Sequence, residues 1–244
     1  MRDRLRLAIN GANGRMGRAL QDLLHDDARF ELAAAIGASN EWRDVPKLDV
    51  VVDFSSPAGF DAALAHCLAH RVALVSGTTG LEDAQRNGMA EAAHAVPVLH
   101  AANFSLGIAV LSRVLREAAA ALPDWDLEII EAHHARKIDA PSGTALALGR
   151  VAAEARNKKF DEVAVLSREG QVGVRAAGAI GFATIRAGEI VGEHTAMLAT
   201  SGERLELSHR ATDRGIFARG AVAAAAWLAG KPAGTYSLDD VLLG

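Results

Sequence analysis

The segment from Glu131 to Thr144 concentrates side chains that can do acid–base chemistry. It contains the adjacent pair His133 and His134, followed by Lys137 and a Pro-Ser-Gly-Thr turn. Histidine titrates near neutral pH, and a lysine in a closed pocket loses part of its basicity, so both can exchange a proton with a ligand. The turn has the composition of a helix start, whose unpaired amides and positive dipole end attract anions. These residue types together predict an active site.

The sequence around this segment predicts a strand-to-helix connection. Residues 127–131 alternate apolar and acidic side chains like a half-buried strand, and residues 144–152 follow a helical pattern. Functional residues often gather on such connections. A bare histidine pair also occurs at solvated strand ends and in packed cores, but Lys137 and the turn favour the chemical interpretation. Because His133 and His134 would point to opposite faces of an extended segment, we predict no metal site.

A second motif lies near the N-terminus. The strand-like residues 5–10 run directly into the glycine-rich sequence 11–17, which opens a predicted helix near Arg15. Glycines in this position permit a tight turn and let backbone amides approach a pyrophosphate. We therefore predict dinucleotide binding by six consecutive residues of this loop: Gly11, Ala12, Asn13, Gly14, Arg15 and Met16. The alternative is a tight strand-to-helix turn that binds no ligand.

Two further loops follow predicted strands at the same sheet edge. The ends of parallel strands form the ligand crevice of an open α/β sheet. We expect these loops to border a nicotinamide, although either could be a plain turn. The residues are Gly77, Thr78 and Thr79 after one strand, and Ala101, Ala102, Asn103 and Phe104 after the next.

The second predicted strand lacks the acid that usually binds the adenosine ribose. It ends at Ile36 and is followed by Gly37-Ala38-Ser39-Asn40. Without a carboxylate there, a 2′-phosphate would not be repelled, and Ser39, Asn40 or Arg43 could help to hold it. The sequence therefore leans toward NADPH, or toward use of both NADPH and NADH.

The order of the elements predicts an α/β protein with two domains. Strands expected near 5–10, 31–36, 49–54, 72–76 and 96–101 alternate with helices, which is typical of a parallel sheet covered by helices. After Asn103 a helix leads away, and several strand-like stretches follow between 163 and 210. We predict a dinucleotide-binding domain at 1–103, completed by 215–244 with a helix at 215–229, and a substrate-binding and oligomerisation domain at 104–214.

Composition points to a small-molecule partner. The 244 residues have a formal net charge of −4, without the basic excess of a nucleic-acid-binding protein. The apolar runs are shorter than the roughly 18 residues of a membrane span, and no signal-peptide pattern precedes the first strand, so we expect a cytoplasmic location. The single Cys67 excludes an internal disulfide, and its helical surroundings favour a buried thiol over a reactive one.

These motifs together resemble the 4-hydroxy-tetrahydrodipicolinate reductase family, also called dihydrodipicolinate reductase, of the diaminopimelate and lysine pathway. The resemblance spans nearly the whole chain and is carried by Gly11–Gly17, Val52–Ser55, Ser76–Gly80, Asn103–Ser105, Glu131–Thr144 and Ala187–Thr195. It implies an N-terminal Rossmann-type parallel sheet, a second α+β domain built on a mixed sheet, and a homotetramer assembled through the C-terminal domains.

The resemblance also implies a reaction and the residues that perform it. A nicotinamide hydride, from NADPH or NADH, reduces a cyclic imine dicarboxylate with loss of its hydroxyl as water. His133 matches the family's proton donor or acceptor and Lys137 its proton donor, while His134, Gly143 and Thr144 match substrate-binding positions. The loop after the second strand is shorter than in many relatives, so the family's cofactor preference does not transfer.

Two other functions are compatible with parts of the sequence. A nucleotide sensor could use the glycine loop, but the donors between His133 and Lys137 would then have no task. A dehydrogenase acting on another small carboxylate would use the same residues, and a substrate panel separates it from the imine reductase.

Overall fold

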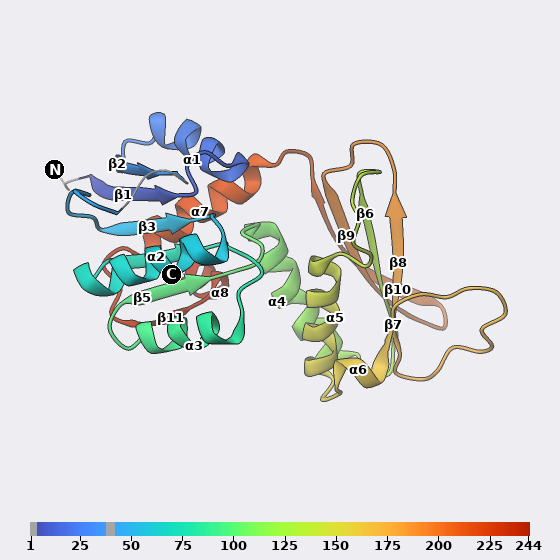
Figure 1. The fold of residues 1–244 in the computed structure, drawn as a ribbon. Helices are drawn as coiled ribbons and strands as arrows, with labels where there is room; N and C mark the ends of the chain where they lie inside the picture. Colours follow the sequence, from blue (N-terminus) through green and yellow to red (C-terminus); the bar gives the residue numbers. More distant parts are fainter. Residues whose placement is uncertain (1–3, 38–41) are drawn as a thin grey trace. The chain divides into compact units, whose positions relative to one another are not determined.

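The computed structural model describes residues 4–37 and 42–244, which divide into two compact units (Figure 1). The first unit contains the chain up to Leu106 together with Gly215–Gly244, and the second contains Gly107–Arg214. Within the described residues, no helix has the length and apolar character needed to cross a membrane.

A six-stranded parallel sheet forms the centre of the first unit. Central strands such as β3 are buried along their whole length, as expected where helices cover both faces. The strand order is β11-β5-β4-β3-β1-β2. The strands are β1 (Leu5–Asn10), β2 (Phe30–Ile36), β3 (Val50–Asp53), β4 (Ala73–Ser76), β5 (Pro97–His100) and β11 (Gly234–Tyr236).

Helices pack on the two faces of this sheet in two groups. Helix α2 packs against α3, whereas α7 packs against α1 and α8. Helix α2 begins as its sequence predicts, because the Ser56 side chain accepts a hydrogen bond from the Gly59 amide and Pro57 opens the first turn. The helices are α1 (Arg15–His25), α2 (Pro57–His70), α3 (Asp83–Ala92), α7 (Gly215–Leu228) and α8 (Leu238–Leu243).

The second unit is a mixed five-stranded sheet in the order β10-β9-β6-β8-β7. Residues of α4 and α5, including Leu115 and Leu148, form one hydrophobic core with Ile129 and other residues of the sheet. The elements are α4 (Leu106–Ala121), β6 (Asp126–His133), α5 (Gly143–Ala155), α6 (Phe160–Val163), β7 (Ala164–Val165), β8 (Ile180–Arg186), β9 (Gly192–Thr200) and β10 (Glu203–Ala211). The predicted fold class is confirmed, with one parallel and one mixed sheet.

The strand register of the second sheet brings together residues that are distant in sequence. Glu131 on β6 lies opposite His194 on β9 and opposite Thr184 on β8. His133, two residues further along β6, is paired with Arg186. Because side chains alternate between faces along a strand, all five side chains lie on the same face of the sheet.

Candidate active site

The glycine loop of the first unit is a tight strand-to-helix turn. Gly11 has φ of +82°, and a Cβ atom there would overlap the carbonyl oxygen of Phe54. The amides of Gly11 and Ala12 both donate to the carbonyl of Ile36 at 2.9 Å, which ties the loop to the end of β2. Gly14 then caps α1. Position 11 therefore requires glycine, both for its positive φ and for its close approach to the Phe54 backbone.

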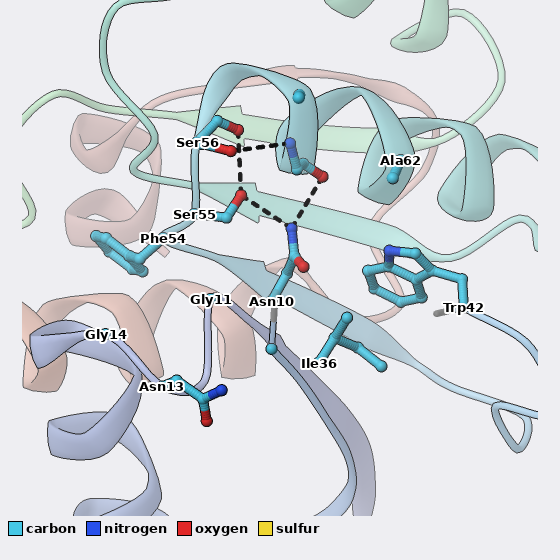
Figure 2. Close-up of a pocket in the computed structure, with 13 residues that line it drawn as sticks. Asn10, Gly11, Asn13, Gly14, Ile36, Trp42, Phe54, Ser55, Ser56 and Ala62 are labelled. Carbon is cyan, nitrogen blue, oxygen red and sulfur yellow. Dashed lines mark hydrogen bonds between the residues drawn. The ribbon is translucent and has the colours of Figure 1, made fainter. Parts of the chain in front are cut away.

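A cavity of about 710 Å³ lies beside this loop (Figure 2). Three of the predicted loop residues line it, namely Gly11, Asn13 and Gly14. The other lining residues come from the ends of β1, β2 and β3 and from the start of α2: Asn10, Ile36, Gly37, Trp42, Phe54, Ser55, Ser56, Ala58, Gly59 and Ala62. Sequence reasoning did not assign these residues a site role, because their contribution depends on how neighbouring strands end together.

Trp42 forms an aromatic wall of this cavity. Its indole stacks on the His66 ring with centroids 4.5 Å apart and an interplanar angle of 30°. Trp42 and Ile36 both line the cavity (Figure 2), so part of its wall is aromatic and aliphatic. Such a surface suits contact with a planar aromatic ring.

Asp53 holds the loops around the cavity together. Its side chain is fully buried at the end of β3 and accepts hydrogen bonds from residues at or just after the ends of β1, β3 and β4. The donors are Asn10 Nδ2 at 2.8 Å, Ser55 Oγ at 2.5 Å, Ser76 Oγ at 2.7 Å and Thr78 Oγ1 at 2.7 Å. This network fixes the carboxyl ends of β1, β3 and β4 relative to one another.

The other predicted residues of the glycine loop do not line the cavity. Ala12 is buried, Arg15 is exposed at the first residue of α1, and Met16 is half-buried. Arg43 is exposed, while Ser39 and Asn40 lie outside the described residues.

The loops after β4 and β5 surround the Phe54 side chain. The Phe54 ring packs edge-on against Phe104 at 5.3 Å, and a Cβ at Gly77 would overlap the same ring. Thr78 is buried and turned toward Asp53. Of the remaining predicted residues, Thr79 and Ala102 are exposed, and Ala101 and Asn103 are half-buried.

Glu131 is the centre of the site in the second unit. Its fully buried side chain lies 2.6 Å from His133 Nδ1 and accepts hydrogen bonds from both terminal nitrogens of Arg186 at 2.8 Å and from the Ser142 amide at 3.0 Å. Burial by itself would raise the pKa of Glu131, but these donors outweigh burial and hold the pKa at about 2. The carboxylate is therefore ionised at neutral pH.

Two histidines of this site are kept neutral. Burial lowers the pKa of His133, although its hydrogen bond to Glu131 opposes that change. Burial, aided by the neighbouring His133, lowers the pKa of His194 to about 4. The two rings meet edge to face at 5.2 Å, and His194 Nε2 lies 3.1 Å from Ser142 Oγ. His194 is therefore a buried neighbour of the His133 ring.

Lys137 lies on the connection between β6 and α5. Its ammonium group contacts both carboxylate oxygens of Asp139, at 2.7 and 2.8 Å, and its side chain is 21% exposed. Arg136 forms a two-bond pair with Glu189, and the amide of Ala135 donates to Gly188, so the β8–β9 turn supports this connection. The Lys137 side chain is thus partly exposed and held by Asp139, on a connection that the β8–β9 turn supports.

The start of α5 adjoins Glu131. Ser142 caps the helix by accepting a hydrogen bond from the Ala145 amide, and its own amide donates to Glu131. Gly143 is exposed, and a Cβ there would meet nothing within 4 Å. Thr144 is half-buried one residue further on. Because the first amides of a helix have no acceptor within the helix, this end of α5 is suited to a carboxylate.

The predicted substrate residue His134 is half-buried just after β6. Its Nδ1 atom is buried without a hydrogen-bond partner in the part of the chain that the structure describes. Arg186 and Thr184 were not predicted as site residues, because they approach Glu131 only through the pairing of β8 with β6. The one available signal was Arg186 at the end of a strand-like run before Ala187-Gly188.

The fold and the two sites define the protein as a two-domain, NAD(P)H-dependent oxidoreductase. Two family models cover almost all of the chain: dihydrodipicolinate reductase N-terminus matches residues 5–104, and dihydrodipicolinate reductase C-terminus matches residues 107–242. The chain belongs to the dihydrodipicolinate reductase family, which confirms the resemblance inferred from the sequence.

Solved structures agree with this assignment. A dipicolinate-bound dihydrodipicolinate reductase from Paenisporosarcina sp. TG-14 is 25% identical with a TM-score of 0.79, covering 96% of this chain and 98% of that chain. GenD2 from gentamicin A biosynthesis, in complex with NAD, is 15% identical with a TM-score of 0.58 over 99% and 91% of the two chains. An engineered D-amino acid dehydrogenase bound to NADP+ is 15% identical with a TM-score of 0.54 over 97% and 93%. The last two share the fold.

Proposed function

We propose that this protein reduces 4-hydroxy-tetrahydrodipicolinate to tetrahydrodipicolinate in lysine and diaminopimelate biosynthesis, with a reduced nicotinamide dinucleotide as hydride donor. Membership of the dihydrodipicolinate reductase family supports this function. The observation that carries it is the meeting of the Glu131–His133 pair with the start of α5 at one end of the second sheet. This arrangement combines a proton-transfer group with a carboxylate-binding helix start.

The cavity of the first unit fits a dinucleotide. Gly11 and Gly14 keep the backbone at the start of α1 open to a pyrophosphate, since a side chain at either position would crowd the loop. The aromatic and aliphatic side chains of Trp42 and Ile36 line this cavity and suit contact with an adenine ring. When bound, the nicotinamide supplies the hydride for the reduction.

The end of β2 favours NADPH over NADH. Gly37 carries no carboxylate to bind an unphosphorylated ribose, and a Cβ there would meet the end of the exposed Asn13 side chain, which can move aside. Placing a carboxylate there with Gly37→Asp should lower the NADPH-to-NADH ratio of kcat/KM by roughly 10-fold, because the charge repels a 2′-phosphate. An unchanged ratio would mean that the phosphate does not lie near Gly37, and Gly37→Asn controls for the added volume.

The second unit supplies the groups that hold the substrate and exchange its proton. Lys137, His134 and the amides of Gly143 and Thr144 would bind the two carboxylates. His133 and Lys137 are the two groups that can transfer a proton as the ring is reduced. Asp139 contacts the Lys137 ammonium, so a substrate carboxylate competes with Asp139 for the same donor.

The expected homotetramer is part of this proposal. The face of the second sheet opposite α4 and α5 carries Ile185, which is 49% exposed, with the half-buried Ile130 and Met197 on neighbouring strands. These apolar side chains, which lie among Glu128 and Thr195 of the same face, offer a small area for contact with a second copy of the chain. Light scattering after gel filtration measures the assembly, and a monomer mass would refute it.

The direct test is loss of absorbance at 340 nm. Purified protein receives NADPH or NADH, and the upstream synthase generates the substrate in the cuvette. We expect oxidation that requires the synthase and its substrates, at a rate that ranks the two cofactors. If both cofactors bind but neither is oxidised, the proposed reaction is wrong.

A further inference from the structure

The buried Glu131 carboxylate determines which nitrogen of His133 carries hydrogen. An ionised carboxylate only accepts hydrogen bonds, and Glu131 Oε2 lies 2.6 Å from His133 Nδ1. Both terminal nitrogens of Arg186 donate to the same carboxylate, which keeps it charged. A hydrogen atom on Nδ1 satisfies this contact, whereas a bare Nδ1 would place a lone pair against a negative charge.

We propose that Glu131 is a positioning residue that fixes His133 as the Nδ1-protonated tautomer and leaves Nε2 as the atom that exchanges a proton with the substrate. This inference rests on the proposed function for the identity of the substrate. The tautomer itself follows from the contacts of the second unit alone.

The surroundings of Nε2 agree with this role. In the described chain no side chain forms a hydrogen bond with His133 Nε2, although the side chain is only 12% exposed. Gly192 lies against this edge of the ring, and a Cβ there would be 3.1 Å from Nε2. His194 packs edge to face on the ring. The ring is therefore clamped in one orientation, while a glycine keeps space beside the reactive nitrogen.

The same contacts define how the proton moves. In the neutral ring Nε2 has a lone pair and accepts one proton, which gives an imidazolium whose charge faces Glu131. Returning that proton from Nε2 restores the neutral ring, while Nδ1–H and the ionised carboxylate stay unchanged throughout. Arg186 balances the charge of Glu131 in both states. One proton is exchanged at one atom.

The tautomer can be observed directly in the wild-type protein. In long-range ¹H–¹⁵N spectra of the full chain labelled with ¹⁵N-histidine, the His133 signals are those that disappear in His133→Asn. We expect a protonated-type shift for Nδ1 and an unprotonated-type shift for Nε2 near neutral pH. The reverse pattern would overturn the proposal, and this readout does not depend on the variant at Glu131 being folded.

A kinetic test examines the charge of Glu131. Glu131→Gln keeps the size of the side chain but removes the charge that stabilises imidazolium, so the limb of the kcat profile set by His133 should move to lower pH and kcat should fall by roughly 100-fold. Cofactor affinity should not change. Glu131→Asp keeps the charge and should keep that limb closer to its wild-type position.

Glu128→Gln is the matched control, because Glu128 lies on the same strand and is also bound by arginines, Arg168 and Arg175, on the other face of the sheet. It should leave the pH profile and the His133 spectrum unchanged. If Glu131→Gln lowers kcat without moving the limb, Glu131 has a structural role only. A correct tautomer in a protein without reductase activity would instead reject the proposed function.

Discussion

The two candidate sites of this protein differ in whether backbone or charged side chains form them. In the first unit the glycine loop proposed to bind the cofactor is mainly backbone: Gly11 and Gly14 create space, and Asp53 ties strand ends together. In the second unit the site is an arrangement of charges, in which the Glu131 carboxylate contacts both His133 and Arg186. The first site should therefore be sensitive to added volume, and the second to removed charge or to added protons.

The sharpest separation of the two sites comes from removing both predicted acids. His133→Ala combined with Lys137→Ala should reduce turnover by roughly 10⁴-fold, because each proton-transfer group contributes about 10²-fold or more. The cofactor loop is untouched, so NADPH affinity measured by nucleotide fluorescence should stay within about 2-fold. Lys159→Ala, an exposed lysine of the same unit, serves as the control. An equal loss of cofactor affinity would contradict the division between the sites.

Acid should destabilise the second site through two groups with depressed pKa values. His194 has a folded pKa of about 4 against an ordinary 6.5, so stability falls as pH decreases from 6.5 toward 4. Glu131 has a folded pKa of about 2 against 4.5, so its contribution is lost between 4.5 and 2. Each change corresponds to about 3 kcal/mol.

Urea unfolding at a series of pH values measures this loss. His194→Gln should make the decrease between pH 6.5 and 4 smaller, by the contribution of His194, while keeping a polar partner for Ser142. A stability curve that is flat in that interval for the wild-type protein would show that His194 is not held neutral by the fold.

An added methyl group tests the backbone character of the first site. Gly11→Ala places Cβ against the Phe54 carbonyl at a left-handed φ of +82°. We expect the free energy of unfolding to fall by about 1–3 kcal/mol, together with weaker cofactor binding. Gly14→Ala is the milder comparison, since its Cβ would lie 3.2 Å from the Gly11 oxygen. If neither change affects NADPH affinity, the loop does not bind the cofactor.

The smallest expected effect is that of the same substitution in the second site. A Cβ at Gly143 meets nothing within 4 Å, so Gly143→Ala should leave the thermal midpoint unchanged. The methyl group would lie where a substrate carboxylate approaches the start of α5, and KM should rise by roughly 10-fold. An unchanged KM would remove Gly143 from the substrate site.

The sequence alone predicted the elements and the motifs within them. Strands such as β3 and β4 are mainly apolar runs, and closely spaced glycines predict the turn after β1. Local sequence patterns were therefore sufficient to predict these elements. The short strand β11, with three residues, and helix α8 were not predicted. Three residues give too little pattern to indicate a strand, and β11 is recognised mainly by its pairing with β5. The same limit applies to Trp42, which lines the cavity only because β2 ends beside β1.

The residue types of the candidate active site could be predicted from the sequence, but the contacts between their side chains could not. His133 and Lys137 stand in one segment whose residue types indicate proton transfer. That Glu131 is ionised, that it bonds to Nδ1, and that Arg186 and His194 surround it were decided by the register of β6 with β8 and β9. The pKa of a carboxylate and the tautomer of a histidine depend on neighbours within a few ångströms, and strand pairing brings those neighbours from more than fifty residues away.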